Sequence, residues 1–270
     1  MKYLFDNIKE IEAKIKKAKM VLLACDFDGT LAGIEALPSM VRFSQEAKKI
    51  FSLLTRNEKI TAGIISGRPI AELKKITQFN NKKVFYAGNH GFEIQLSGEG
   101  KFIYPPAKES VVLLKKTALR LKQALKGYEG ILVEEKGYSL SIHYRNCHKK
   151  DAVAFKKDVN RICLPFVKEG QIKLSGGKKV IEVRPPFDWN KGTALEWIEK
   201  RLKKAGNKFL TIYIGDDKTD EDAFAKIKNG FGIYVGRKKK RSAAGFYLPN
   251  PKQVLKFLSF LNKLFDTATV

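Results

Sequence analysis

The amino-acid sequence predicts an α/β protein, with a Rossmann-like parallel sheet core and an inserted α+β domain. In the first 90 residues, apolar runs typical of buried strands alternate with helical patterns, and a polar loop follows each run. Between about residues 106 and 182 the pattern changes to helix, hairpin, helix, hairpin, and the earlier plan then returns. We therefore expect a discontinuous core of residues 1–105 and 183–270, interrupted by an α+β domain at residues 106–182.

The elements of the core follow from two kinds of apolar spacing. Apolar residues three and four apart predict amphipathic helices over residues 4–18, 43–54, 191–204 and 252–265, and a further helix that ends at Ile227. Continuous apolar runs predict the strands Val21–Cys25, Lys59–Ile65, Val84–Ala87, Phe209–Ile214 and Gly232–Val235. Because polar loops follow the carboxyl ends of these strands, we expect a functional site at that edge of the sheet.

The inserted segment has helices and hairpins of its own. A short hairpin formed by Phe92–Leu96 and Lys101–Tyr104 precedes it. Within it we expect helices over residues 111–125 and 149–163, and the strands Ile131–Glu135, Tyr138–Tyr144, Gln171–Leu174 and Val180–Arg184. The last two strands are expected to turn at Ser175-Gly176-Gly177.

Length and composition limit the class of protein. A chain of 270 residues with 44% hydrophobic and 30% charged residues is long enough to bury a core and is typical of a soluble globular protein. The first residues lack the apolar core of a signal peptide, and the chain has no run of about 18 apolar residues. Three widely spaced cysteines argue against a disulfide framework and against a CxxC metal site. We therefore expect a cytoplasmic protein without a membrane anchor.

The net charge of +24 is the main anomaly of the composition. Such a charge suits nucleic acid, an anionic membrane surface or a phosphorylated substrate. Most lysines, however, are spread over helical patterns, and residues 237–241 form the one dense run. No RNA-binding signature or zinc-finger spacing accompanies them, so the charge alone does not predict a nucleic-acid partner.

Side chains suited to chemistry follow the predicted strands. Residues i and i+2 of a strand share a face, so Asp26 and Asp28 can project together from the end of the first strand. Adjacent carboxylates repel, so the pair needs a metal ion, a shared proton or a dedicated chemistry. Oxygen ligands grouped without His or Cys suit Mg²⁺. The other candidates at strand ends are Ser66, Arg68, Lys191, Asp216, Asp217 and Asp220.

The order of these motifs resembles a known family. DFDGTL, a serine that ends a strand, a lysine and GDDKTDEDAF together resemble the haloacid-dehalogenase-like (HAD) phosphohydrolase superfamily. Five blocks, SGRP, GNHG, EEKGYSLSIHYR, KKVIEVRPPFDWNKGTAL and GDDKTDEDAF, narrow the resemblance to the trehalose-6-phosphate phosphatase family. The resemblance covers residues 21–225 and implies an enzyme of trehalose biosynthesis, a phosphoric monoester hydrolase that converts trehalose 6-phosphate to trehalose and phosphate.

The resemblance also implies a mechanism. Asp26 is expected to be the nucleophile that forms an aspartyl-phosphate intermediate. Asp28 is expected to protonate the leaving sugar oxygen and then to deprotonate water. Ser66 and Lys191 are expected to bind and neutralise the phosphoryl oxygens. The Mg²⁺ ligands implied are the carboxylates of Asp26 and Asp216 and the backbone carbonyl of Asp28, with Asp217 or Asp220 as an additional candidate.

The inserted domain is expected to be the cap that closes over the active site and reads the sugar. A sugar offers many hydroxyls, so paired acidic and basic side chains suit its recognition. The substrate-binding residues implied are Arg68, Asn89 and His90 on the core, and Glu134, Lys136, Arg145, Lys178 and Glu182 on the cap. The choice between Glu134 and Glu135 stays open, and His143 fits a packed strand residue as well as a ligand.

The sequence alone leaves two other functions open. A phosphatase for sucrose phosphate, glucosylglycerate phosphate or a similar sugar phosphate would share the core motifs, because selectivity lies in the cap. A basic nucleic-acid-binding protein on the same scaffold is less favoured, because a polyanion site does not need three clustered carboxylates. The substrate is thus expected to be a small sugar phosphate, and the resemblance leaves a functional coupling to a trehalose-phosphate synthase open.

Overall fold

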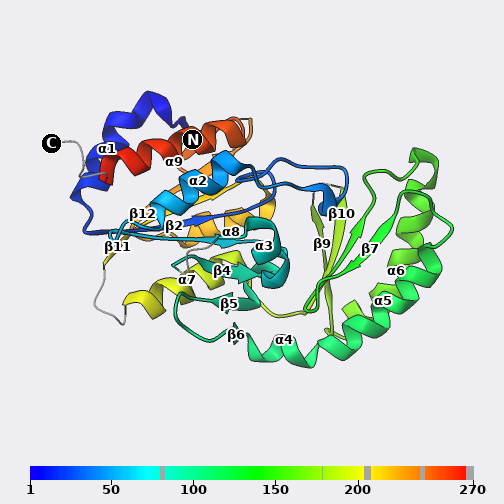
Figure 1. The fold of residues 1–270 in the computed structure, drawn as a ribbon. Coiled ribbons are helices and arrows are strands. Elements are labelled where there is room, and N and C mark those ends of the chain that lie inside the picture. Colours follow the sequence, from blue (N-terminus) through cyan, green and yellow to red (C-terminus); the bar gives the residue numbers. More distant parts are fainter. Residues whose placement is uncertain (80–82, 178, 204–207, 238–240, 266–270) are drawn as a thin grey trace. The chain divides into compact units, whose positions relative to one another are not determined.

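The computed structural model describes the chain except for residues 80–82, 178, 204–207, 238–240 and 266–270 (Figure 1). Contacts divide the chain into two compact units, Met1–Phe102 with Trp189–Val270 and Ile103–Asp188. The predicted boundaries at residues 106 and 182 lie inside the second unit. The roles of the two parts as catalytic core and cap stay a prediction.

The first unit is built on one large sheet. Its strand order is β1-β13-β12-β11-β2-β3-β4-β5-β6, and the pairs from β1 to β4 are parallel whereas β4 and β5 are antiparallel. The predicted α/β class with a parallel-dominated sheet is therefore confirmed. The strands are β1 (Lys2–Tyr3), β2 (Met20–Cys25), β3 (Ile60–Ile65), β4 (Phe85–Gly88), β5 (Glu93–Gln95), β6 (Phe102–Ile103), β11 (Phe209–Gly215), β12 (Gly230–Val235) and β13 (Phe246–Leu248).

The register of the central strands brings the predicted site residues to one edge. Cys25, the last residue of β2, lies opposite Ile64 of β3 and Ile214 of β11. Since these strands are parallel, the residues that follow them lie at the same carboxyl edge of the sheet. Asp26, Ser66 and Asp216 are thus neighbours in space although they are far apart in sequence.

Helices cover both faces of this sheet, because the side chains of β2 alternate between two hydrophobic cores. Val21, Leu23 and Cys25 pack in the core that also contains buried residues of α1, α2, α3 and α9. Leu22 and Ala24 pack in the core that contains buried residues of α7 and α8. The helices are α1 (Ile8–Lys17), α2 (Gln45–Leu54), α3 (Ile70–Thr77), α7 (Lys191–Lys203), α8 (Lys218–Lys226) and α9 (Pro251–Phe265).

The second unit is an α+β fold with a sheet of order β7-β8-β10-β9, in which each neighbouring pair is antiparallel. Leu114, Phe155 and Ile142 share its core, so α5 and α6 cover one face of this sheet (Figure 1). Its elements are α4 (Pro105–Glu109), α5 (Val111–Leu125), β7 (Leu132–Glu135), β8 (Leu140–His143), α6 (Ala152–Lys168), β9 (Lys173–Gly177) and β10 (Val180–Arg184).

Several predicted boundaries were wrong. Ser175–Gly177 belong to β9 instead of forming a turn, because they pair with residues 180–182 of β10. The helix expected over residues 4–18 begins only at Ile8, after a 3-10 turn at Phe5–Asn7 that follows β1. None of the described helices is long and apolar enough to cross a lipid bilayer.

Candidate active site

The turn after β2 brings two acidic segments into close contact. Asp26 continues the sheet, because its backbone N–H donates to the carbonyl of Ile214 at 2.8 Å. Gly29 then adopts a φ of +83°, and a Cβ at this position would lie 2.3 Å from Oδ2 of Asp216. Glycine is needed here for both reasons, the left-handed backbone and the absence of a side chain. The DxDG motif thus fixes the approach of Asp216 to the loop that carries Asp26 and Asp28.

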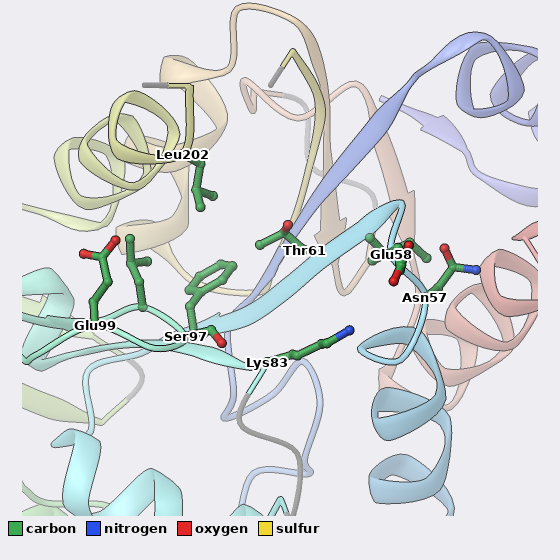
Figure 2. Close-up of a pocket in the computed structure, with 10 residues that line it drawn as sticks. Asn57, Glu58, Thr61, Lys83, Ser97, Glu99 and Leu202 are labelled. Carbon is green, nitrogen blue, oxygen red and sulfur yellow. The ribbon is translucent and has the colours of Figure 1, made fainter. Parts of the chain in front are cut away.

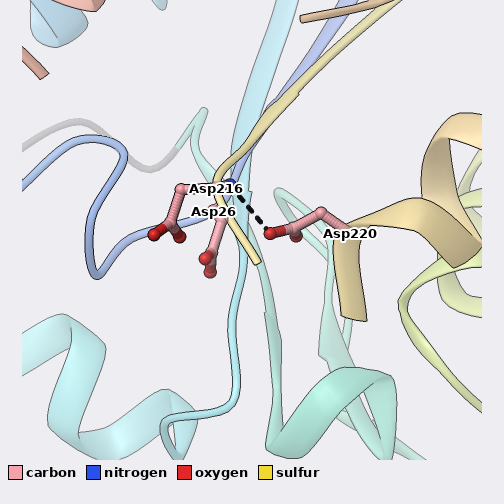
Figure 3. A group of neighbouring side chains, drawn as sticks. All are labelled: Asp26, Asp216 and Asp220. Carbon is pink, nitrogen blue, oxygen red and sulfur yellow. Dashed lines mark hydrogen bonds between the residues drawn. The ribbon is translucent and has the colours of Figure 1, made fainter. Parts of the chain in front are cut away.

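Asp26, Asp216 and Asp220 form a buried group of carboxylates (Figure 3). One oxygen of each lies within 4.8 Å of the others, and the three residues are at most 5% exposed. Burial raises the pKa of the Asp26 carboxyl, and the charges of Asp220 and Asp216 raise it further. Lys191 opposes them, but the pKa stays well above its ordinary value. Such a group favours the binding of a cation with hard oxygen ligands.

Lys191 lies between two of these carboxylates. It is the first residue of α7 and 2% exposed, and its Nζ is 2.9 Å from Oδ1 of Asp26 and 2.8 Å from Oδ1 of Asp220. Burial lowers the pKa of Lys191, but the charges of Asp220 and Asp26 outweigh it and raise the pKa above its ordinary value. The ammonium therefore remains charged beside Asp26.

Asp220 is the anchor of this cluster. Its Oδ1 accepts hydrogen bonds from Nζ of Lys191 and from the hydroxyl of Tyr213, at 2.8 and 2.7 Å. Its Oδ2 accepts from the backbone N–H groups of Asp216 and Asp217, at 3.0 and 2.9 Å. Asp217 is the N-cap of α8, and it completes a capping box with Asp220. Both oxygens of Asp220 are therefore occupied by protein donors, whereas Asp217 serves the helix start.

Asp28 and Asp26 are each paired with a buried cation, Arg68 and Lys191. Arg68 donates from Nε to Oδ2 of Asp28 at 2.6 Å and from Nη2 to Oδ1 at 2.8 Å. The guanidinium also binds the carbonyl of Pro38 at 3.0 Å and the carboxylate of Glu72. Burial lowers the pKa of Arg68, but Asp28 and Glu72 outweigh it and raise the pKa. The expected repulsion between Asp26 and Asp28 is thus balanced by Lys191 and Arg68.

The other predicted core residues lie around the end of β3. Ser66 is 1% exposed, its Oγ accepts from the N–H of Arg68 at 3.2 Å, and its carbonyl accepts from the N–H of His90 at 2.9 Å. A Cβ on Gly67 would lie 2.8 Å from the ring of His90, so this ring packs against the glycine. The side-chain amide of Asn89 donates to Glu93 at 2.9 Å. The GNHG loop thus packs directly against the SGRP loop.

In the second unit, a group of polar residues gathers on the sheet face opposite α5 and α6. Ser141 pairs with Glu134 on one side and Glu182 on the other, and its Oγ donates to Oε1 of Glu182 at 2.7 Å. Nζ of Lys136 lies 3.6 Å from a carboxylate oxygen of each glutamate. Glu135 instead forms an ion pair with Lys122 of α5. Glu134 therefore lies in this cluster and Glu135 does not, whereas the choice of the sugar-binding glutamate stays a prediction.

Three further predicted or ambiguous residues belong to the second unit. Nε2 of His143 lies 2.8 Å from Oε2 of Glu134, so the ambiguous histidine belongs to the same face. Arg145 is exposed just beyond β8, and the predicted Lys178 lies outside the described residues. Neither Ser141 nor Tyr213 is among the site residues predicted from the sequence. Ser141 is two residues before His143, so strand alternation could have placed the two on one face. Tyr213 lies inside an apolar strand, and no sequence pattern distinguishes it from a packing residue.

A pocket elsewhere on the first unit contains none of these residues (Figure 2). It has a volume of about 290 Å³ and lies near the amino ends of β3 and β4, where Ile60, Thr61 and Phe85 line it. Chemistry in this fold class belongs to the opposite, carboxyl edge. The acidic cluster around Asp26, and not this pocket, is therefore the candidate active site.

Comparison with known proteins identifies the family of the chain. The sequence profile of the trehalose-phosphatase family matches residues 24–252. Trehalose-phosphate phosphatase B of Arabidopsis thaliana is 32% identical over 270 residues, which cover 96% of this chain and 69% of that protein. Trehalose 6-phosphate phosphatase RA3 of Zea mays is also 32% identical, over 90% of this chain and 70% of that protein.

Solved structures show the same fold. The C-terminal domain of a C. albicans trehalose-6-phosphate phosphatase is 26% identical, with a TM-score of 0.81 over 95% of this chain and 97% of that chain. A haloacid dehalogenase-like hydrolase from Bacteroides thetaiotaomicron is 16% identical, with a TM-score of 0.63 over 90% of this chain and all of that chain, and is similar in fold alone. The protein is thus a phosphatase with the HAD fold. Within that class, the chain belongs to the trehalose-phosphatase family, as its motifs predicted.

Proposed function

We propose that the protein hydrolyses trehalose 6-phosphate to trehalose and phosphate in a Mg²⁺-dependent reaction, through an aspartyl-phosphate on Asp26. The observation that carries the proposal is the position of Lys191, a buried cation held between the carboxylates of Asp26 and Asp220. A carboxylate nucleophile and a phosphate repel each other, so a fixed ammonium beside Asp26 favours their approach. The named relatives support trehalose 6-phosphate as the substrate.

Asp26 would attack phosphorus as the sugar oxygen leaves, and the phosphoryl group would pass to its carboxylate. Lys191 would neutralise charge on the equatorial phosphoryl oxygens, where charge gathers in the transition state. Ser66 would donate a hydrogen bond to the same group, from the end of the neighbouring strand. The register of β2 and β3 supports these roles, because it places Asp26 and Ser66 at one edge.

The buried acidic cluster fits Mg²⁺ by its donor chemistry. Asp26 and Asp216 would hold the ion, with the backbone carbonyl of Asp28, because both oxygens of Asp220 already accept hydrogen bonds. Burial and the neighbouring carboxylates raise the pKa of Asp26, and a bound cation would favour its charged form. When bound, the ion would offset the negative charges of the nucleophile and the phosphate.

Asp28 would act as the acid and base of the reaction. It would protonate the leaving sugar oxygen and then take a proton from the water that hydrolyses phosphoryl-Asp26. Arg68, expected at first to bind substrate, contacts both oxygens of Asp28 in this structure. We infer that Arg68 sets the orientation of the Asp28 carboxylate, while Asn89 and His90 line the phosphate side of the site.

We propose that the second unit is the cap and that its polar sheet face reads the disaccharide. Glu134, Lys136 and Glu182 lie close enough there to accept from and donate to neighbouring sugar hydroxyls. Arg145 and Lys178 are proposed to complete the sugar site. We also propose a cytoplasmic location and a functional coupling to an enzyme that supplies trehalose 6-phosphate.

The test is phosphate release from a panel of sugar phosphates with and without Mg²⁺. We expect kcat/KM for trehalose 6-phosphate to exceed that for glucose 6-phosphate and sucrose 6-phosphate by at least about tenfold, equivalent to about 1.4 kcal/mol in transition-state binding. Equal turnover of glucose 6-phosphate would exclude the proposed substrate. Mg²⁺-dependent phosphate release by an Asp26→Asn variant would exclude the proposed nucleophile.

A further inference from the structure

Tyr213 is a polar residue in an apolar position. It lies in β11, is fully buried, and packs in the hydrophobic core beneath α7 and α8. Its ring meets that of Phe224 edge-on, with the two ring centroids 5.6 Å apart. Phenylalanine would fill the same space without a hydroxyl to satisfy. A buried hydroxyl costs free energy unless it is hydrogen-bonded, so its partner indicates why a tyrosine stands here.

That partner is the carboxylate that also holds Lys191. The Tyr213 hydroxyl donates to Oδ1 of Asp220 at 2.7 Å, and Nζ of Lys191 donates to the same oxygen at 2.8 Å. The other oxygen of Asp220 is held by two backbone N–H groups. The four donors together fix both the position of the carboxylate and its rotation about the Cβ–Cγ bond.

The charge on Oδ1 of Asp220, the oxygen that Tyr213 and Lys191 share, affects how closely the ammonium of Lys191 approaches Asp26. With Tyr213 donating to Oδ1, part of the negative charge of Asp220 is already satisfied, so the ammonium is also free to reach Asp26 at 2.9 Å. Without the hydroxyl, Oδ1 would attract Lys191 more strongly and draw the ammonium away from Asp26. The effect would fall on the reacting phosphoryl group, because Lys191 is the cation nearest to the proposed nucleophile among the ion pairs of the described residues.

We propose that Tyr213 is a positioning residue, whose hydroxyl acts through Oδ1 of Asp220 to hold the ammonium of Lys191 beside Asp26. Tyr213 itself touches no substrate. The inference rests on the proposed roles of Lys191 and Asp26, and it adds a residue that carries none of the chemistry but determines where the charge lies.

The test compares two tyrosine-to-phenylalanine variants. Tyr213→Phe removes the hydroxyl that binds Asp220. Tyr86→Phe is the matched control, because Tyr86 is also buried and its hydroxyl lies 2.9 Å from Oγ1 of Thr77, in the other core of the same sheet. Both variants lose one buried hydrogen bond, so a merely structural role predicts similar losses of thermal stability and activity for the two.

For Tyr213→Phe we expect kcat to fall roughly tenfold with KM unchanged within about twofold, since Lys191 acts most strongly in the transition state. The fall should be similar for trehalose 6-phosphate and p-nitrophenyl phosphate, because the phosphoryl group is common to both. Tyr86→Phe should retain wild-type kcat. Both variants are assayed at a temperature at which thermal unfolding shows them to be folded.

Two results would overturn the inference. One is a Tyr213→Phe variant with the same kcat as Tyr86→Phe, and the other is a change confined to KM. A failure of the proposed function is distinguishable from either. It would appear as an active Lys191→Ala or Asp26→Asn variant, whereas the inference alone fails when both of these are inactive and Tyr213→Phe is as active as its control.

Discussion

Arg68 holds both carboxylate oxygens of Asp28, with Nε 2.6 Å from Oδ2 and Nη2 2.8 Å from Oδ1. Arg68 is 5% exposed, and it is fixed in turn by Glu72 and the carbonyl of Pro38. A two-point contact sets the plane of a carboxylate, which a lysine cannot do. The orientation of the proposed acid and base is thus built into the SGRP loop.

Replacing Arg68 with lysine should therefore impair the step that needs the proton. We expect kcat for trehalose 6-phosphate to fall roughly tenfold, and kcat for p-nitrophenyl phosphate to fall less, because p-nitrophenolate leaves without protonation. Steady-state kinetics on the two substrates check this, with the exposed Arg42→Lys as control. Equal losses on both substrates would show that Arg68 acts on the phosphate instead.

Replacing Asp26 with asparagine should abolish activity and stabilise the metal-free protein. We expect kcat to fall by at least about a thousandfold, because the nucleophile is lost. Burial raises the pKa of Asp26 above its ordinary value of 3.8. A carboxyl with a raised pKa stabilises the folded state fully only while it is protonated, below the unfolded-state pKa. This stabilisation is lost as the pH rises through the folded-state pKa.

The variant should consequently have the higher free energy of unfolding at pH 7, and its advantage should shrink as the pH is lowered toward 3.8. Denaturant unfolding in a metal chelator at several pH values measures this. Asp188→Asn is the control, because the Asp188 side chain is fully exposed. A variant that is less stable than the wild type at pH 7 would contradict the prediction.

How much of this site could be predicted from the sequence depends on whether strand ends or loop paths bring the residues together. Asp26, Ser66 and Asp216 could be brought together from sequence, because each directly follows an apolar run and parallel strands align their ends. The Asp28–Arg68 pair could not be derived in the same way. This contact depends on the turn at Gly29 and on the path of residues 66–69, which apolar patterns do not determine.

The contacts of Tyr213 and Glu134 could not be predicted from the sequence, for two different reasons. Within the apolar run of β11, Tyr213 is indistinguishable from a packing residue until α8 brings Asp220 to its hydroxyl. Glu134 and Glu135 are adjacent in β7, so their side chains point to opposite faces of the sheet. Which of the two lies in the polar cluster depends on which face α5 covers, and tertiary packing determines this. Apolar periodicity locates strands, but it does not determine which polar neighbours they meet.

Mg²⁺ should stabilise the protein through Asp216. A ligand at about 100 times its Kd adds roughly 2.7 kcal/mol to the free energy of unfolding, which corresponds to a rise in Tm of about 5 °C or more for a unit of this size. Asp216→Asn should lose most of that rise. Asp217→Asn should keep it, because Asp217 caps α8 and asparagine caps a helix equally well. Thermal unfolding with and without Mg²⁺ distinguishes the two, and loss of the rise in Asp217→Asn alone would reverse the assignment.

His143 should matter for the disaccharide but not for the phosphate. Its Nε2 lies 2.8 Å from Oε2 of Glu134, and Nζ of Lys136 lies 3.6 Å from the same oxygen. Removing one hydrogen bond that orients Glu134 costs about 0.5–1.5 kcal/mol. For His143→Ala we thus expect KM for trehalose 6-phosphate to rise roughly two- to tenfold, with kcat/KM for p-nitrophenyl phosphate unchanged.

The matched control is His148→Ala, because His148 is an exposed histidine that also contacts a glutamate, Glu129, at 3.3 Å. His148→Ala should leave the kinetics on both substrates unchanged, since neither His148 nor Glu129 belongs to the polar sheet face. If His143→Ala lowers the turnover of both substrates equally, the histidine supports the fold of the second unit and not its recognition of sugar. A selective loss would instead connect Glu134, through one hydrogen bond, to the choice of substrate.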